Sequence, residues 1–252
     1  MSKTEIIVKD NSRQLAEAGA RLFTKVALAS VRERGHFAVA ISGGSTPRGV
    51  HRLLAEEPHR SEVPWKRTSL FWVDERCVPV TDDRSNYGLA KRDLLDKVPL
   101  PMSQIHPMPV EVPSDMGAQE YQREIQNFFQ VGEEQIPEFD LIFLGIGTDG
   151  HTASLFPGQR ALKEQKQWIV AVKGGDPNVS RLTMTYPLLN RARVIVILVS
   201  GKGKAAILKT LFEEKQTGLP AAGIKPTNGE LTWLIDRDAA VGITKEVFHG
   251  NS

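Results

Sequence analysis

Four short segments of the chain combine residue types that bind anions or transfer protons. They are Ser42–Thr46, Asp74–Arg76, Asp149–His151 and Ser200–Lys204. Glycine amides, hydroxyls, arginine and lysine are the usual donors to phosphate and carboxylate groups. A histidine close to a carboxylate can accept a proton from water near neutral pH. Together the four segments predict a site that binds an anionic substrate and performs acid–base chemistry on it.

Each of these segments follows a short apolar run of the kind that forms a strand buried on both faces. The expected strands are Phe37–Ile41, Leu70–Val73, Phe139–Leu144 and Val194–Val199, with Leu231–Ile235 as a fifth candidate. Helical patterns separate them, and this alternation predicts an α/β fold, with a doubly wound, mostly parallel sheet flanked by helices. Because ligands bind beyond the carboxyl ends of the strands in such sheets, the four segments should meet along one edge.

The expected helices have recognisable starts. We interpret the residues before the first strand as one long helix, with Asn11 or Ser12 as its cap. Pro47 suits the first turn of the next helix, and Asn86 could cap a third. The Pro-rich stretch Pro99–Pro113 is the strongest linker candidate, but it is too short to separate domains. The whole chain, residues 1–252, is therefore expected to form a single domain.

The first segment consists of Ser42, Gly43, Gly44, Ser45 and Thr46, between a strand and a helix. Two glycines allow a ligand to approach the backbone closely, and hydroxyls and helix N-terminal amides can donate to an anion. These features favour phosphate binding. The alternative is a tight turn capped by Thr46.

Two further segments offer cations. In Asp74–Arg76 the guanidinium of Arg76 has a planar fork suited to phosphate, although a surface cluster of ion pairs would have the same composition. Lys204 follows a glycine turn at the start of a helix, where a phosphate would gain both charge and amides; the alternative is a solvated lysine. This turn is not a P-loop, because Leu198 stands in place of the first glycine and Ala205 in place of the required Ser or Thr.

Gly145, Gly147 and Gly150 match the spacing of a dinucleotide-binding loop. That loop should open a helix and be followed by a strand ending in an acidic residue. Here Pro157 and Gly158 interrupt the segment soon afterwards, so we reject nicotinamide binding.

Asp149 and His151 are the informative residues of the same loop. Flexible backbone at a strand end can direct both side chains toward a ligand, so His151 could act as a general base and Asp149 could orient or support it. The alternative is a histidine that only caps the loop.

Composition excludes several classes of function. The net charge is +2, so no global field favours nucleic acid or an anionic membrane. The single cysteine, Cys77, allows no internal disulfide and suits a reducing compartment; it is better explained as a small buried residue than as a nucleophile. Neither a zinc motif nor a G-x-S-x-G elbow is present. We expect a cytoplasmic protein without metal, cofactor, membrane segment or obligate protein partner.

Taken together, the motifs resemble those of the 6-phosphogluconolactonase family. The matching stretches are Ser42–Pro47, Trp72–Arg76, Ser85–Gly88, Phe139–Pro157, Arg181–Thr185 and Gly201–Ala205. The resemblance implies a fold shared with glucosamine-6-phosphate deaminases and ribose-5-phosphate isomerases, and cofactor-free hydrolysis of a phosphosugar lactone in the oxidative pentose phosphate pathway. It also implies that His151 and Asp149 are catalytic. The expected substrate- or phosphate-binding residues are Ser42, Gly43, Gly44, Ser45, Thr46, Asp74, Arg76, Arg181 and Lys204.

Two rival functions remain at this stage. The deaminases resemble this chain in the glycine loop and the Asp-Gly-His element, but their pattern has a catalytic glutamate five residues after the histidine, where this chain has Phe156. A non-catalytic sugar-phosphate sensor would usually have a helix-turn-helix unit ahead of the related domain. The single helix expected before the first strand is too little for that unit.

Overall fold

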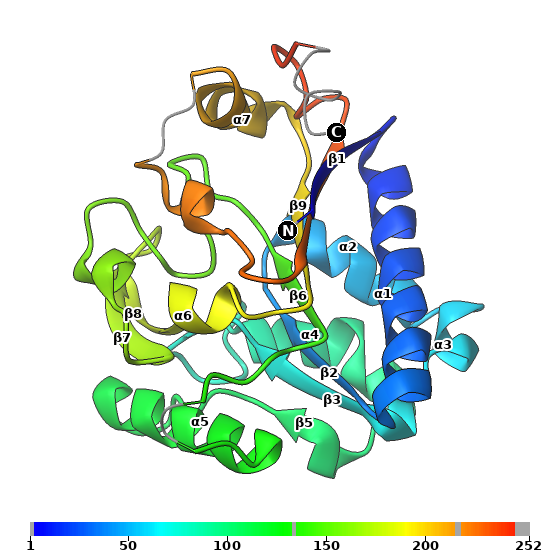
Figure 1. Ribbon diagram of the computed structural model, residues 1–252, viewed down its shortest axis with the longest axis vertical. Helices are drawn as coiled ribbons and strands as arrows, with labels where there is room; N and C mark the ends of the chain where they lie inside the picture. The colour runs from blue at the N-terminus through cyan, green and yellow to red at the C-terminus, as the bar shows by residue number, and fades with distance from the viewer. Residues whose placement is uncertain (1–2, 133–134, 215–217, 245–252) are drawn as a thin grey trace.

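The computed structural model describes residues 3–132, 135–214 and 218–244, and its centre is a seven-stranded sheet in which every neighbouring pair is parallel (Figure 1). The spatial order is β1-β10-β9-β6-β2-β3-β5. The strands are β1 (Lys3–Lys9), β2 (Phe37–Ile41), β3 (Thr68–Trp72), β5 (Ile105–His106), β6 (Leu141–Leu144), β9 (Val194–Val199) and β10 (Glu230–Asp236). All five strands expected from the sequence are present, so the doubly wound α/β prediction is confirmed.

Two strands of this sheet were not expected. The long helix expected with Asn11 or Ser12 as its cap is confirmed, but the interpretation of all the residues before β2 as helix was wrong, because Lys3–Lys9 forms β1, which pairs with β10 along its whole length. The helix α1 (Ser12–Arg34) begins only after it, and the side chain of its cap, Asn11, accepts from the amide of Gln14 at 3.0 Å. The second strand, β5, lies within the Pro-rich stretch 99–113 and pairs with β3.

Helices cover the sheet on both faces (Figure 1). Among them, α1 packs against β1, β2, β10 and the neighbouring helix α2. The other helices are α2 (Ser45–Leu54), α3 (His59–Glu62), α4 (Asn86–Asp93), α5 (Ser114–Phe129), α6 (Tyr186–Leu189) and α7 (Ala205–Phe212). Short 3-10 turns comprise Trp65–Arg67, Leu95–Lys97, Met102–Gln104, Arg160–Lys163, Lys202–Lys204 and Pro220–Gly223. No helix in the described part of the chain is long and apolar enough to cross a membrane.

The cap of α4 differs from the expectation. Ser85, not Asn86, is the cap residue, and its Oγ accepts from the amide of Gly88 at 3.0 Å. Asn86 is instead the first residue of the helix. Its side chain is therefore free to take part in the site described below.

A second, smaller sheet lies beside the main one. It is antiparallel, in the order β4-β8-β7, and consists of β4 (Asp74–Arg76), β8 (Val179–Met184) and β7 (Ile169–Gly174). Val73 joins the two sheets, because its amide donates to Ile41 of β2 and its carbonyl accepts from Met184 of β8. The sequence did not suggest this sheet, yet it determines where Arg76 and Arg181 lie.

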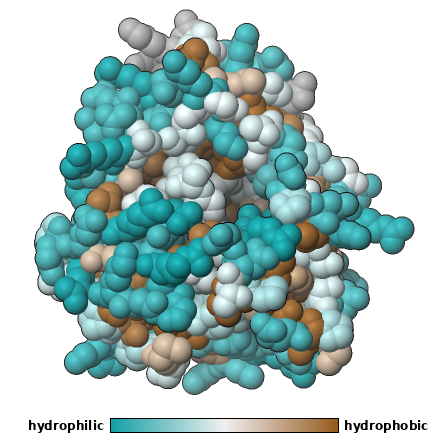
Figure 2. All heavy atoms as spheres, turned by 180° about the vertical axis from the view of Figure 1, so that it is seen from behind, coloured by the Kyte–Doolittle hydropathy of each residue, from teal (hydrophilic) through white to brown (hydrophobic). Residues whose placement is uncertain are grey.

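The surface view from behind is mostly hydrophilic, with hydrophobic residues in separated patches (Figure 2). Large hydrophobic side chains are exposed at scattered positions: Val8, Leu28, Val80, Met102, Met116 and Val241. Scattered apolar residues of this kind are ordinary on monomeric surfaces.

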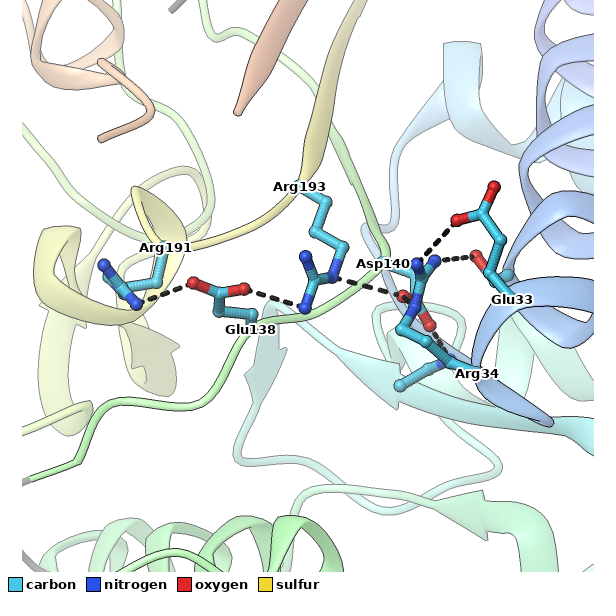
Figure 3. Close-up of polar contacts among 8 residues, drawn as sticks. Glu33, Arg34, Glu138, Asp140, Arg191 and Arg193 are labelled. Atoms are coloured by element: carbon cyan, nitrogen blue, oxygen red, sulfur yellow. Dashed lines mark hydrogen bonds and ion pairs between the residues drawn. The ribbon is translucent and has the colours of Figure 1, made fainter. Parts of the chain in front are cut away.

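At the amino ends of the central strands, a chain of ion pairs connects helix and sheet (Figure 3). Glu138 lies between Arg191 and Arg193, and Asp140 lies between Arg193 and Arg34. Asp140 is the buried member at 3% exposure, and its Oδ2 also accepts from the amide of Ala38 in β2 at 2.8 Å.

Asp140→Ala should lower the free energy of unfolding by about 2–4 kcal/mol, because it leaves the Ala38 amide and Nε of Arg34 without their acceptor. Glu138→Ala is the matched control. Its ion pairs are more exposed, so the loss there should stay within about 1 kcal/mol. Urea unfolding of both variants measures the difference, and equal losses would contradict the role given to Asp140.

His51 provides a second test of the core. It is 2% exposed in α2, and neither ring nitrogen has a hydrogen-bond partner among the described residues. Burial lowers its pKa from 6.5 to about 4, although Asp93 opposes the shift, and Arg48 and Arg52 add to it. The folded protein therefore binds this proton less readily than the unfolded chain does, so stability is lost as the pH falls from 6.5 toward 4.

Between pH 7 and pH 4, the wild type should lose about 3 kcal/mol more unfolding free energy than His51→Met. Methionine is similar in size and carries no titrating group. Denaturant unfolding at both pH values measures this difference. Parallel losses in the two proteins would show that His51 does not titrate in this way.

Candidate active site

The four segments predicted from the sequence meet at one cavity of about 210 Å³ beyond the carboxyl ends of β2, β6 and β9. His151 lines it, and so do all the predicted binding residues: Ser42, Gly43, Gly44, Ser45, Thr46, Asp74, Arg76, Arg181 and Lys204. Asp149 does not line the cavity but contacts His151 directly. Residues from widely separated parts of the chain therefore meet beyond the carboxyl ends of the strands, as expected from the sequence.

His151 and Asp149 form a hydrogen-bonded pair in the loop after β6. The distance from His151 Nδ1 to Asp149 Oδ1 is 2.6 Å, and the His151 amide donates to the same oxygen at 3.1 Å. Because a carboxylate oxygen accepts, Nδ1 carries the proton in the neutral ring and Nε2 is left as the basic nitrogen. Gly147 is required beside them, since a Cβ there would lie 2.1 Å from His151 Nδ1.

The electrostatics keep Asp149 available as a carboxylate. Burial alone would raise its pKa, but the amide and imidazole of His151 lower the pKa overall. Lys204 lies within electrostatic range of Asp149. Burial lowers the pKa of Lys204, while Asp149 opposes that shift.

Arg76 and Arg181 are direct cross-strand partners in the small sheet. Like charges directly opposite one another are destabilising in a sheet unless an anion lies between them. Burial and then the charge of Arg76 lower the pKa of Arg181, against the opposing effect of Asp74 and Glu75. Such a pair is well suited to bind a phosphate dianion bidentately.

Several contacts hold these guanidinium groups in place. Arg181 is 4% exposed; its Nε donates to the carbonyl of Gly174 at 2.9 Å, and its Cζ lies 5.4 Å from the centre of the Phe156 ring. Arg76 donates from Nη1 to the carbonyl of Arg84 at 2.6 Å, while its buried Nε has no partner among the described residues. A ligand could therefore accept from Arg76 without displacing a protein group.

The glycine loop leads into α2. Gly44 is the residue before the helix, with a φ of 94°, and no side chain caps it. The amides of Ser45 and Thr46 at this helix start lie beside the cavity and can donate to an anion. Thr46 lies inside the helix, so the alternative of a turn capped by Thr46 is wrong.

The carboxylates of Asp74 and Glu75 have structural partners. Asp74 Oδ2 accepts from Ser154 Oγ at 2.6 Å. Glu75 accepts from the amides of Arg76, Asn86 and Tyr87 at 2.7–2.8 Å. Glu75 thus holds the start of α4 against β4.

The chain is similar to proteins of one family over most of its length. The family model described as glucosamine-6-phosphate isomerases/6-phosphogluconolactonase matches residues 10–233. The chain belongs to this family. It is 41% identical over 239 residues to the 6-phosphogluconolactonase of Synechocystis sp., covering 93% of this chain and 96% of that protein.

Solved structures agree. The 6-phosphogluconolactonase from Trypanosoma cruzi superposes with a TM-score of 0.84 at 29% identity, covering 97% of this chain and 98% of that one. A monomeric glucosamine-6-phosphate deaminase superposes with a TM-score of 0.79 at 19% identity over 94% of this chain and 99% of that one. At that identity the second likeness concerns the fold alone.

Within the family, Phe156 distinguishes this site from the deaminase pattern described above. Its ring centre lies 4.8 Å from that of His151 and 5.4 Å from Cζ of Arg181. An apolar ring therefore stands where that pattern expects a carboxylate, directly beside the proposed base.

Sequence reasoning missed two features of the site. Asn86 was interpreted as a helix cap, yet it lines the cavity at 2% exposure. Ala153 also lines it with a φ of 48°, which is unusual for a residue other than glycine. The match of Ser85–Gly88 to the family pattern was the signal for Asn86. Cys77 does not line the cavity, and burial and then Glu75 raise the pKa of its thiol, so neither observation favours a nucleophile.

Proposed function

We propose that the chain hydrolyses 6-phospho-D-glucono-1,5-lactone to 6-phospho-D-gluconate, the second step of the oxidative pentose phosphate pathway. The observation that carries this proposal is the placement of Phe156. It leaves the His151–Asp149 pair as a base for water, without the carboxylate that the deaminase pattern requires. The similarity to the 6-phosphogluconolactonase of Synechocystis sp., at 41% identity, supports the same conclusion.

In the proposed mechanism, His151 Nε2 takes a proton from a water molecule as its oxygen attacks C1 of the lactone. Asp149 holds the ring and stabilises the imidazolium that forms. When the tetrahedral intermediate collapses, the bond from C1 to the ring oxygen breaks and His151 returns the proton to that oxygen. The lactone is an activated ester, so this sequence needs no covalent enzyme intermediate.

Positioning supplies the rest of the rate enhancement. We propose that Arg76 and Arg181 bind the phosphate, with Lys204 contributing positive charge on the side of Asp149. Amides and hydroxyls of Ser42–Thr46 donate to the bound substrate. A phosphate anchored away from C1 fixes the reacting carbon relative to water and base.

Two substrates separate this function from its main rival. Purified protein is mixed either with freshly generated 6-phosphogluconolactone or with glucosamine 6-phosphate, and lactone loss and ammonium release are followed. Lactone hydrolysis without ammonium release is the expected result. Ammonium release at a comparable kcat/KM would assign the chain to the deaminases instead.

The reaction should not depend on a metal ion. Among the residues that the structure describes, no group of three or more His, Cys, Asp or Glu side chains could hold one. Activity should therefore persist after dialysis against a strong chelator, with the chelator present in the assay. Loss of activity that a divalent cation restores would overturn this prediction.

We also propose that the chain acts in the cytoplasm, with a phosphosugar lactone as its partner and no nucleic acid, membrane or obligate protein partner. The single cysteine and the small net charge support this proposal.

A further inference from the structure

Asn86 lines the cavity, and both its backbone and its side chain are held by hydrogen bonds. Its amide donates to Glu75 Oε1 at 2.8 Å, and Glu75 is itself 1% exposed. Its side-chain Nδ2 donates to the carbonyl of Asp74 at 2.8 Å and to Asp74 Oδ1 at 3.3 Å. Ser154 fixes the other oxygen of that carboxylate at 2.6 Å. Backbone and side chain of Asn86 are both preorganised.

These partners determine which way the side-chain amide faces. A carbonyl and a carboxylate can only accept hydrogen bonds, so the atom directed at Asp74 must be the NH₂ group. The carbonyl oxygen, Oδ1, is therefore the atom left over. It is buried and has no hydrogen-bond partner among the described residues.

The chain leaves space for this oxygen. A Cβ built at Gly43 would lie 1.8 Å from Asn86 Oδ1, so only glycine at position 43 allows the amide to lie there. Gly43 and Asn86 line the same cavity as Arg76 and His151. A buried acceptor without a donor is costly, and such an atom on a residue that lines a binding cavity indicates a ligand that donates.

We propose that Asn86 Oδ1 accepts a hydrogen bond from a ring hydroxyl of the substrate and so selects for a hydroxylated sugar lactone. This inference rests on the proposed function. The chemistry of the substrate limits which of its groups can donate to Oδ1, because the phosphate dianion and the lactone carbonyl have no proton to donate. Only the hydroxyls on C2, C3 and C4 can satisfy the oxygen.

The test compares kcat/KM for 6-phosphogluconolactone with kcat/KM for its 2-deoxy, 3-deoxy and 4-deoxy analogues. In the wild type, kcat/KM for one analogue should be lower by roughly 10–100-fold, because the missing hydroxyl leaves the buried oxygen unpaired. In Asn86→Ala, the ratio of kcat/KM for the full lactone to kcat/KM for that analogue should fall to about twofold or less. The variant has no buried acceptor that the missing hydroxyl could leave unpaired.

Ser154→Ala is the matched control. It also removes a donor to Asp74 but leaves Asn86 Oδ1 present, so it should keep the wild-type ratio even if overall activity falls. A ratio that persists in Asn86→Ala would overturn the proposal. If that variant does not fold, the wild type still decides, because equal kcat/KM for all four lactones would also overturn it. Wild-type hydrolysis of the full lactone tests the proposed function separately, whatever the ratios are.

Discussion

His151→Asn is expected to lower kcat by about 100-fold or more while leaving the binding of 6-phosphogluconate largely intact. The structure gives the reason: Asp149 occupies Nδ1 at 2.6 Å, so Nε2 is the nitrogen available to take a proton. Asparagine retains some hydrogen bonding but cannot accept that proton. Steady-state kinetics and calorimetric titration with 6-phosphogluconate measure the two quantities.

The pH dependence of the reaction in the wild type and in His151→Asn provides a second test of whether His151 is the base. Because the pKa of Asp149 is lowered, that carboxylate stays ionised as the pH falls through the range in which histidines usually titrate. An acid-side fall in wild-type kcat that comes from the base should therefore be lost in His151→Asn, whereas protonation of the substrate phosphate, with a second pKa of about 6, lowers kcat/KM in both proteins. The assay must be corrected for spontaneous hydrolysis, which rises with pH. Near wild-type kcat in a correctly folded His151→Asn variant would mean that another group is the base.

Arg76→Ala should lower kcat/KM for 6-phosphogluconolactone by about 10–150-fold and change little for plain gluconolactone. Hydrogen bonds between charged groups are worth roughly 1.5–3 kcal/mol, which corresponds to that range. Arg76 is the better choice of the pair, because Arg181 is more deeply buried and its loss would disturb the packing of the protein more. The comparison of the two substrates isolates the contribution of the phosphate.

Arg92→Ala is the matched control for loss of positive charge. Arg92 lies in α4 and pairs with the exposed Asp83, outside the lining of the cavity. It should leave the preference for the phosphorylated substrate unchanged. A wild type that hydrolyses both lactones with near-equal kcat/KM would show that Arg76 and Arg181 serve another purpose.

The sequence was sufficient to predict which segments form the site, but not how their side chains are arranged. The strand ends at Ser42, Asp149 and Lys204 could be predicted, because apolar runs and the turns after them are local signals. The cross-strand pairing of Arg76 with Arg181 could not be predicted, because it depends on contact between β4 and β8, which lie about 100 residues apart in the sequence. Arg181 was named only through its motif.

Local patterns also misled at two points. The short run Lys3–Lys9, with only three apolar residues, forms a strand that pairs with β10 along its whole length, so its tertiary partner decides its structure. Asn86 has the residue type of a cap, but Ser85 takes that position and Glu75 binds the next two amides. The direction of a side chain at a helix start follows from such contacts rather than from residue preference.

The most direct measurement is the rate at which the purified protein removes freshly generated 6-phosphogluconolactone, set against the spontaneous rate in the same buffer. We predict a rate that is proportional to enzyme concentration and well above the spontaneous rate, with stoichiometric formation of 6-phosphogluconate. Lactone loss at the spontaneous rate, in a folded protein that binds 6-phosphogluconate, would contradict the account.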